Sequence, residues 1–273
     1  MSRLVFYTNK YASGEIRGRQ MAAAVGAVVD ADTVYPDDVL VMIKGIPPQE
    51  IIDYVKKVYV DVDDGYGLIP LLKERSKAQP IAASRVGQKY LEEQLGRKVL
   101  MIPGHHCNFE RTVRVTHKVA TAGFMGYPEH LHLDPVDLSD ALGKIGINFV
   151  TKTKFSSREE VCDFWRSIDV QICFRKKSDT NPVPELRDPL KLINASSFGV
   201  PTIAYPEPTY ADEFGGYFYE AHSLDDIVRH CKALASNGWA YHSVSMALIQ
   251  YAEQYHIQHI APLFRRLLDD TSV

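Results

Sequence analysis

Residues 187–201 read Arg-Asp-Pro-Leu-Lys-Leu-Ile-Asn-Ala-Ser-Ser-Phe-Gly-Val-Pro and are the most informative segment for the architecture of the chain. It predicts a helix from Pro189 to Phe198, because Asp188 is a suitable cap and a proline is tolerated in a first turn. Gly199 suits the position just after a helix. The apolar run Thr202–Ala204 follows at once and predicts a buried strand. A helix that leads directly into a buried strand is the repeating unit of an α/β sheet.

Two cations, Arg187 and Lys191, lie at the start of this predicted helix. A helix start in an open α/β sheet favours phosphate, because its N–H groups and its dipole attract negative charge. The two side chains are suited to neutralise a diphosphate. The alternative is a capped helix whose cations are only solvated.

The same alternation extends in both directions from this segment. Strands are expected at Leu4–Tyr7, Val39–Ile43, Val58–Val62, Ile81–Ala83, Val99–Ile102, Lys118–Ala122, Asn148–Thr151 and Val170–Phe174. Helices are expected at Glu15–Val25, Gln49–Lys56, Val86–Leu95, Asp137–Leu142, Arg158–Arg166, Leu224–Ser236 and from Ala240 onward. Such alternation predicts parallel sheets covered on both faces. A polar stretch at Asn108–His117 interrupts it, so we expect two α/β domains.

The stretch from Pro189 onward also resembles the donor-site signature of GT-B glycosyltransferases. In the large retaining superfamily that includes glycogen and sucrose synthases, the pattern is Pro-x-Lys-Leu-x-Glu-Ala, three residues, then Gly-x-Pro-Val-Val-Ala. This chain has Pro189, Lys191, Asn194, Gly199 and Pro201 at the matching places. The resemblance implies two Rossmann-like domains facing one cleft. It places an acceptor-side domain at 1–115, a nucleotide-sugar domain at 116–255, and a C-terminal helix at 256–273 that packs back towards the first domain.

The resemblance further implies a hexosyltransferase that moves a sugar from a UDP- or GDP-sugar to an acceptor hydroxyl, saccharide or other. It implies no cofactor and no bound metal, because Lys191 and Arg187 take up the phosphate charge. Lys191 is therefore expected to act in catalysis as well as in binding. Asn194 stands where the family has a Glu that grips the ribose, and Leu186, with Glu185 beside it, stands where a second Glu is usual. The missing Glu pair leaves open an inactive protein that only binds nucleotide sugars.

Other donor contacts are expected in two glycine-containing turns and one proline-bounded turn. Ser13, Gly14 and Arg17 follow the first strand, where Ser13 is suited to cap the next helix and Gly14 to admit a ligand close to the backbone. The alternative is an ordinary strand–helix turn. Gly123 is expected in the turn after the first strand of the second domain, near the diphosphate. Tyr210 is expected to line the sugar or base pocket.

Acidic side chains end the predicted strand Val58–Val62. Carboxylates at this edge of a parallel sheet point towards the ligand crevice, so Asp63 or Asp64 is expected to remove the proton of the acceptor hydroxyl. Two alternatives remain: Asp61 and Asp63 as an Asp-x-Asp metal pair of the other main glycosyltransferase fold, or surface acids in a turn. His105 and His106 lack a second ligand cluster, so no metal site is expected.

Composition bounds the remaining possibilities. The net charge of −3 gives no global reason for a polyanion partner. The N-terminal half is slightly more basic than the rest, which permits a phage-type DNA-base glycosyltransferase without favouring it. There is no apolar run of about 18 residues that would span a membrane. The four cysteines match neither a zinc site nor a disulfide scaffold, so we expect reduced thiols and a cytoplasmic protein.

Overall fold

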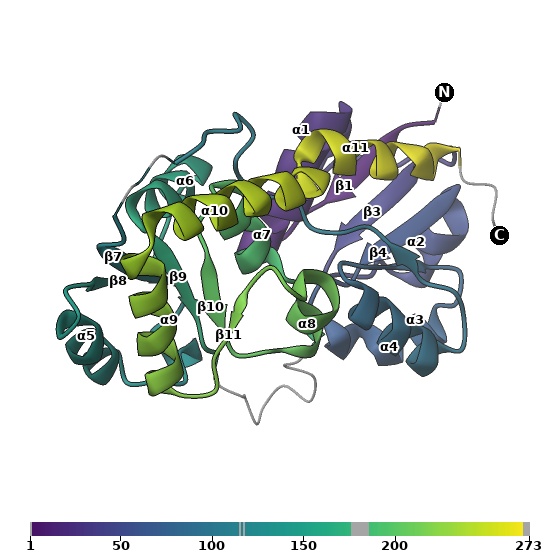
Figure 1. Cartoon of the computed structure of the whole chain (residues 1–273). Helices are drawn as coiled ribbons and strands as arrows, with labels where there is room; N and C mark the ends of the chain where they lie inside the picture. The colour runs from purple at the N-terminus through teal and green to yellow at the C-terminus, as the bar shows by residue number, and fades with distance from the viewer. Residues whose placement is uncertain (1, 115, 117, 176–185, 270–273) are drawn as a thin grey trace. The chain divides into compact units, whose positions relative to one another are not determined.

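The computed structural model describes residues 2–114, 116, 118–175 and 186–269 (Figure 1). These residues form two compact units. The N-terminal unit consists of residues 2–105, 186–188 and 257–269, and the C-terminal unit of residues 106–175 and 189–256 within the described ranges. Each unit has its own parallel sheet, so the predicted α/β fold with two Rossmann-like halves is confirmed. The domain boundaries given above stay a prediction.

The sheet of the N-terminal unit has six parallel strands in the order β2-β1-β3-β4-β5-β6 (Figure 1). In its centre, Val41 is paired with Phe6 on one side and with Tyr59 on the other, and all three side chains are fully buried. Central strands that are buried on both faces are typical of parallel sheets. The strands are β1 (Leu4–Tyr7), β2 (Val28–Val29), β3 (Val39–Ile43), β4 (Lys57–Asp61), β5 (Gln79–Ala82) and β6 (Leu100–Met101).

Helices cover this sheet, and one of them comes from the far end of the chain. The Phe264 ring of α11 lies 5.5 Å from the Phe6 ring of β1, and Arg265 donates to the carbonyl of Val25 in α1 at 2.9 Å. The helix α11 therefore completes the N-terminal core. The helices are η1 (Gly14–Gln20, a π-helix), α1 (Met21–Val25), α2 (Gln49–Tyr54), η2 (Tyr66–Leu68), α3 (Ile69–Glu74), α4 (Arg85–Leu95), α11 (Ile257–Arg265) and η6 (Arg266–Leu268).

The sheet of the C-terminal unit has five parallel strands in the order β11-β10-β9-β7-β8. Its core contains Phe124, Ile172 and Ile203, which are all buried. The strands are β7 (Thr121–Met125), β8 (Asn148–Lys152), β9 (Val170–Cys173), β10 (Thr202–Ala204) and β11 (Tyr219–Glu220). The helical segments are η3 (Pro128–His130), α5 (Pro135–Gly143), α6 (Arg158–Ser167), α7 (Leu190–Ser197), α8 (Pro208–Phe214), α9 (Leu224–Ser236), α10 (Gly238–Ala252) and η5 (Glu253–Tyr255).

Serine caps begin two helices of this unit. The Ser157 hydroxyl accepts the N–H of Glu160 at 3.2 Å, and the Ser223 hydroxyl accepts the N–H of Asp226 at the same distance. Each cap satisfies one of the N–H groups that a helix leaves unpaired at its start. These two serines therefore fix the starts of α6 and α9.

Two helices, α3 and α8, were not expected. Both carry a proline in the first turn, Pro70 and Pro208, where proline is tolerated, and only Pro208 lies in the segment that was expected to be a turn. Gly238 lies just beyond the end of α9 and begins α10, because Asn237 caps that helix by accepting the N–H of Ala240. In the described part of the chain, no helix is long and apolar enough to span a bilayer, and the four cysteines are buried free thiols.

Candidate functional site

The start of α7 brings Lys191 to the carboxyl end of β7. The Lys191 ammonium donates to the carbonyl of Met125, the last residue of that strand, and lies 4.6 Å from the centroid of the Phe124 ring. The helix itself begins one residue later than predicted, with Pro189 as its cap and without a side-chain hydrogen bond. The prediction that Asp188 caps α7 is therefore wrong, and Pro189 precedes the first turn.

Gly126 is the glycine that lies next to the Lys191 ammonium. It follows β7 with φ +147°, and a Cβ placed there would lie 2.6 Å from the Lys191 nitrogen. The prediction that Gly123 lies in this turn is wrong, because Gly123 is in the middle of β7. A Cβ at Gly123 would lie 2.6 Å from Cγ2 of Ile168 and 2.9 Å from Phe164, so this glycine serves close packing against α6 and its C-terminal end.

Asn194 lies one turn after Lys191 on α7 and is buried. Its side-chain Oδ1 accepts the backbone N–H of Cys107 at 2.8 Å. The amide side chain thus fixes the segment that follows residue 105, at the position where the related signature has a ribose-binding Glu. Among the described residues, Asn194 Oδ1 is the acceptor of that backbone N–H. A role of Asn194 in nucleotide binding stays a prediction.

Arg187 belongs to the short stretch 186–188, which is part of the N-terminal unit, whereas Lys191 belongs to the C-terminal unit. Its pairing with Lys191 around one diphosphate stays a prediction. The neighbouring Leu186 is buried, and its carbonyl accepts the hydroxyl of Tyr66 at 2.8 Å. Glu185 lies outside the described residues.

Tyr210 does not line a pocket, contrary to the prediction. It is fully buried in α8, and its hydroxyl lies 3.2 Å from the thiol of Cys173. The guanidinium of Arg175 lies 5.0 Å from the centre of the Tyr210 ring and forms a two-pronged ion pair with Glu207. The proline-bounded turn 205–208 leads into a helix, and this helix turns Tyr210 into the core.

The turn after β1 has a different cap from the one predicted. Ser13 makes no capping hydrogen bond, because the helix already begins at Ala12. Instead, Oδ1 of Asn9 accepts the N–H groups of Tyr11 at 2.9 Å and of Gly14 at 3.2 Å. A Cβ at Gly14 would lie 2.0 Å from the carbonyl oxygen of Asn9. The missing side chain of Gly14 therefore makes room for the backbone of Asn9, and the N–H of Gly14 is already hydrogen-bonded to Oδ1 of Asn9.

Arg17 of the π-helix η1 is buried with 3% exposure, against the expectation of a phosphate contact. Its Nε donates to Oδ2 of Asp61 at 2.7 Å, and Nη2 donates to the carbonyl of Ile102 at 2.9 Å. Burial raises the pKa of Asp61 to about 6 in spite of the Arg17 charge. Burial has the opposite effect on Arg17 and lowers its pKa. The charges of Asp61 and then of Asp63 outweigh burial, so the Arg17 pKa is raised.

Lys44, which the sequence analysis missed, holds both candidate bases. Its ammonium lies 2.9 Å from Oδ2 of Asp63 and also contacts Asp64, at the carboxyl ends of β3 and β4. Lys44 and Asp63 both have a left-handed backbone, with φ +49° and +50°, a strained state that concentrates at functional sites. Burial lowers the Lys44 pKa, but the charges of Asp63 and Asp64 outweigh burial and raise it. A polar residue directly after the apolar run Val39–Ile43 was the available signal.

The alternative metal pair does not form in this arrangement. Asp61 is buried on Arg17, whereas Asp63 is bound by Lys44, so the two carboxylates are held by different cations. Within the described ranges, no three His, Cys, Asp or Glu side chains are grouped as metal ligands. His105 contacts the carbonyl of Ile16 at 2.9 Å through its ring.

No protein-family model and no curated protein sequence matches the chain. Its fold is similar to solved structures at low identity. HepE of Anabaena, determined with UDP, has a TM-score of 0.65 at 10% identity, covering 98% of this chain and 100% of that one. A TarM mutant of S. aureus, determined with Fondaparinux, alpha-GlcNAc-glycerol and UDP, has a TM-score of 0.59 at 11% identity, covering 86% and 56%. The accessory secretory protein 1, 2 and 3 structure of Streptococcus pneumoniae has a TM-score of 0.58 at 10% identity, covering 87% and 54%. The chain spans about half the length of the last two.

Proposed function

We propose that the chain is a glycosyltransferase that moves a hexosyl group from a UDP- or GDP-sugar to an acceptor hydroxyl. The proposal is supported by the fold shared with HepE and TarM, whose structures were determined with UDP. The observation that carries it is the position of Lys191 beside Gly126 at the carboxyl end of β7. Ligands of open α/β sheets bind at this edge, and the missing side chain of Gly126 leaves room there for the Lys191 ammonium.

Lys191 is proposed to bind the diphosphate and to stabilise it as a leaving group. Its ammonium is held at the end of β7 by a neutral carbonyl and by the face of Phe124. A phosphate oxygen is a stronger partner than a carbonyl, because both groups of the new contact are charged. The contact strengthens as the sugar–oxygen bond breaks and negative charge builds on the nucleoside diphosphate, and such stabilisation lowers the barrier.

The acceptor is proposed to bind at the carboxyl edge of the N-terminal sheet, at Asp63 and Asp64. Lys44, directly after β3, holds both carboxylates, which follow the end of the neighbouring strand β4. A carboxylate in this position is suited to accept the proton of the attacking hydroxyl. Asp63 is the more enclosed of the two, with 11% of its side chain exposed against 42% for Asp64.

The proposal is tested by kcat and KM of Lys191→Ala with UDP- and GDP-sugars. A charge-assisted hydrogen bond contributes about 1.5–3 kcal/mol, so a drop in kcat of roughly ten- to a hundredfold is expected. Lys232→Ala is the matched control, because Lys232 is exposed on α9. Circular dichroism checks that both variants fold. Unchanged kinetics in a folded Lys191→Ala variant would place the diphosphate elsewhere.

The same assay separates transfer from binding alone. If the unsubstituted chain binds UDP or GDP but transfers no sugar to any acceptor hydroxyl or to water, it is an inactive nucleotide-sugar-binding protein. Loss of binding in Lys191→Ala would then still locate the diphosphate. If neither nucleotide raises the melting temperature at saturating concentration, the donor assignment fails, because a ligand of the folded state must stabilise it.

A further inference from the structure

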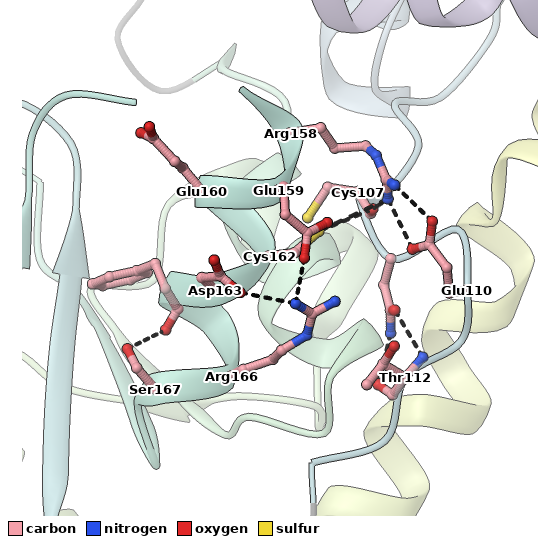
Figure 2. Close-up of polar contacts among 12 residues, drawn as sticks. Cys107, Glu110, Thr112, Arg158, Glu159, Glu160, Cys162, Asp163, Arg166 and Ser167 are labelled. Atoms are coloured by element: carbon pink, nitrogen blue, oxygen red, sulfur yellow. Dashed lines mark hydrogen bonds and ion pairs between the residues drawn. The ribbon is translucent and has the colours of Figure 1, made fainter. Parts of the chain in front are cut away.

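The segment that opens the C-terminal unit is tied down along its length (Figure 2). The N–H of Cys107 is bound by Asn194 of α7. The side chain of Asn108 donates to the carbonyls of Ser197 at 2.8 Å and of Thr112 at 3.0 Å, and its Oδ1 accepts the Thr112 N–H at 2.8 Å. Residues 107–112 therefore have a defined path over α6 and α7.

Arg158, the first residue of α6, clamps the same segment (Figure 2). Its Nη1 donates to the carbonyl of Cys107 at 2.7 Å, and the guanidinium forms a two-pronged ion pair with Glu110 at 2.9 and 2.6 Å. The guanidinium also lies 4.5 Å from the centre of the Phe109 ring. These contacts place a fixed positive charge next to the backbone of Cys107.

Two cysteines lie beside this clamp. Figure 2 shows Cys107 and Cys162 next to Arg158, and the Cys162 thiol contacts the backbone of Cys107. The Cys162 thiol lies 3.4 Å from the Cys107 carbonyl and 3.9 Å from Nη1 of Arg158. Cys107 is 9% exposed and Cys162 is fully buried. The two residues are 55 positions apart, so only the fold brings them together.

The surroundings make the two sulfurs unequal. The Cys162 thiol donates a hydrogen bond to the Cys107 carbonyl. Contact with the Cys107 side chain lowers the pKa of the Cys162 thiol, burial opposes this, and the charge of Arg158 lowers the pKa further. The same contact, followed by burial, raises the pKa of Cys107. Nη1 of Arg158 lies 3.9 Å from the Cys162 sulfur and stabilises a thiolate there, so Cys162 is the better nucleophile and Cys107 the partner that resolves the product.

We propose that Cys107 and Cys162 form a dithiol–disulfide site that is oxidised by peroxides. The Cys162 thiolate attacks one peroxide oxygen, the O–O bond breaks, and Cys162 becomes a sulfenic acid while hydroxide leaves. The Cys107 sulfur, giving up its proton, then attacks the Cys162 sulfur and displaces a second hydroxide. Two thiols and one hydrogen peroxide thus yield one disulfide and two waters, with two electrons passing to the peroxide. A dithiol reductant restores the two thiols by thiol–disulfide exchange and is itself oxidised to a disulfide.

The disulfide ties the opening segment of the C-terminal unit to α6 by a covalent bond. The Cys162 sulfur already lies 3.4 Å from the Cys107 carbonyl and the segment is fixed there, so a local adjustment of the two side chains brings the sulfurs to the bond length of about 2.05 Å. Burial limits access, so peroxide reaches Cys162 when residues 107–112 open locally. Closing a loop of 55 residues restricts the unfolded chain and raises the melting temperature, on the order of 10 °C for a chain of this size.

The test treats the full chain with hydrogen peroxide, unfolds it in iodoacetamide, and analyses the unreduced peptides by mass spectrometry. We expect one cross-linked peptide pair containing Cys107 and Cys162, which disappears after dithiothreitol. Cys231 is the internal control, because burial raises its pKa to about 12 and its thiol stays protonated. Cys231 and Cys173 should remain alkylated. In Cys107→Ser, we expect a sulfenic acid on Cys162 that dimedone traps.

Two results would overturn the proposal. One is full alkylation of Cys107 and Cys162 after peroxide treatment under conditions that oxidise a model thiol. The other is oxidation of all four cysteines at the same rate. The unsubstituted chain alone decides both, so a serine variant that fails to fold does not weaken the test. The readout is chemical and does not depend on sugar transfer.

Discussion

Among single residues, Arg17 and Asp61 illustrate how the fold decides whether a charged side chain faces a ligand or is buried as an ion pair. They are 44 residues apart in the chain, and each was assigned to a ligand-facing turn or strand end. The β-strand register places Asp61 on the buried side, where Arg17 of η1 is its partner and its Oδ1 has no hydrogen-bond partner among the described residues. The result is a buried ion pair that gives the N-terminal unit a pH-dependent stability.

The folded-state pKa of Asp61, about 6, lies above its ordinary value of 3.8. Folded protein therefore holds this proton more tightly than unfolded protein. The contribution to stability is full below about pH 4 and is lost as the pH rises through about 6, which amounts to about 3 kcal/mol. We expect the free energy of unfolding of the Arg17→Met/Asp61→Asn double variant, measured between pH 4 and 7, to lack this decline. Parallel curves for both proteins would contradict the assignment. The single Asp61→Asn variant is less informative, because it leaves Arg17 as an unpaired buried charge.

Asp63 and Asp64 are distinguished by turnover. If Asp63 is the base, Asp63→Asn should lower kcat by roughly 10²- to 10⁴-fold while the affinity for UDP stays unchanged. The amide keeps the size of the side chain, so folding should be preserved. Asp64→Asn is the neighbouring comparison and Asp137→Asn, on exposed α5, is the control. Normal turnover in both neighbouring variants would make these residues no more than ion-pair partners of Lys44.

The sequence could not reveal such pairings. It placed acids at the end of β4, as found, but the partner Lys44 follows another strand and joins them only because β3 and β4 are neighbours. The inward turn of Tyr210 and the burial of Arg17 likewise depend on the orientation of short helices. The pattern that pointed to Lys191 was more informative, because a helix that follows a strand of a parallel sheet begins at the carboxyl edge of that sheet. Its contact with the end of β7 follows from that location.

At the scale of elements, periodicity predicted most strands well. β1, β3 and β10 have the predicted ends, because each is a short, mainly apolar run that begins directly after a charged residue or a proline. β7 begins three residues later than predicted and contains Gly123, which was read as a turn glycine. A glycine in a strand can mark a turn or a close packing contact, and only the position of α6 decides between the two.

Two glycine variants measure that contact. Gly123→Ala adds a methyl group within 3 Å of Ile168 and Phe164, so overpacking should destabilise the C-terminal unit by about 1–3 kcal/mol. Gly143→Ala is the matched control: the residue ends α5 and a Cβ there meets nothing within 4 Å. It should be neutral or stabilising by up to about 1 kcal/mol. Urea unfolding of both variants provides the comparison. Equal stability of the two would mean that β7 and α6 are not tightly packed at this point.

At the scale of the whole molecule, alternation in the sequence was enough to predict two α/β halves, each with a parallel sheet. It could not show that residues 186–188 and 257–269 belong with the first half. Such membership is set by contacts between residues far apart in the chain, as between Phe264 and Phe6, and no local pattern encodes it.

The proposed mechanism as a whole makes a prediction about metal ions. If Lys191 supplies the positive charge for the diphosphate, sugar transfer should survive EDTA with unchanged kcat. The measurement is transfer from the identified donor sugar with EDTA, and then with Mn²⁺ or Mg²⁺ added back. Activity that disappears with EDTA and returns with Mn²⁺ would show that a divalent ion shares the charge of the leaving group, as in other phosphate chemistry.

The late position of α11 has a consequence for synthesis on the ribosome. The strands of the N-terminal unit emerge first, but α11, which packs against α1 and against Phe6 of β1, emerges only after the whole C-terminal unit has been made. At typical translation speeds, this leaves apolar side chains of α1 uncovered for roughly ten seconds or longer. A nascent chain stalled before Ile257 should therefore be cut readily by protease around α1, whereas the released chain should resist. The first unit to be translated is thus the last to be finished, and chaperones have that interval in which to bind it.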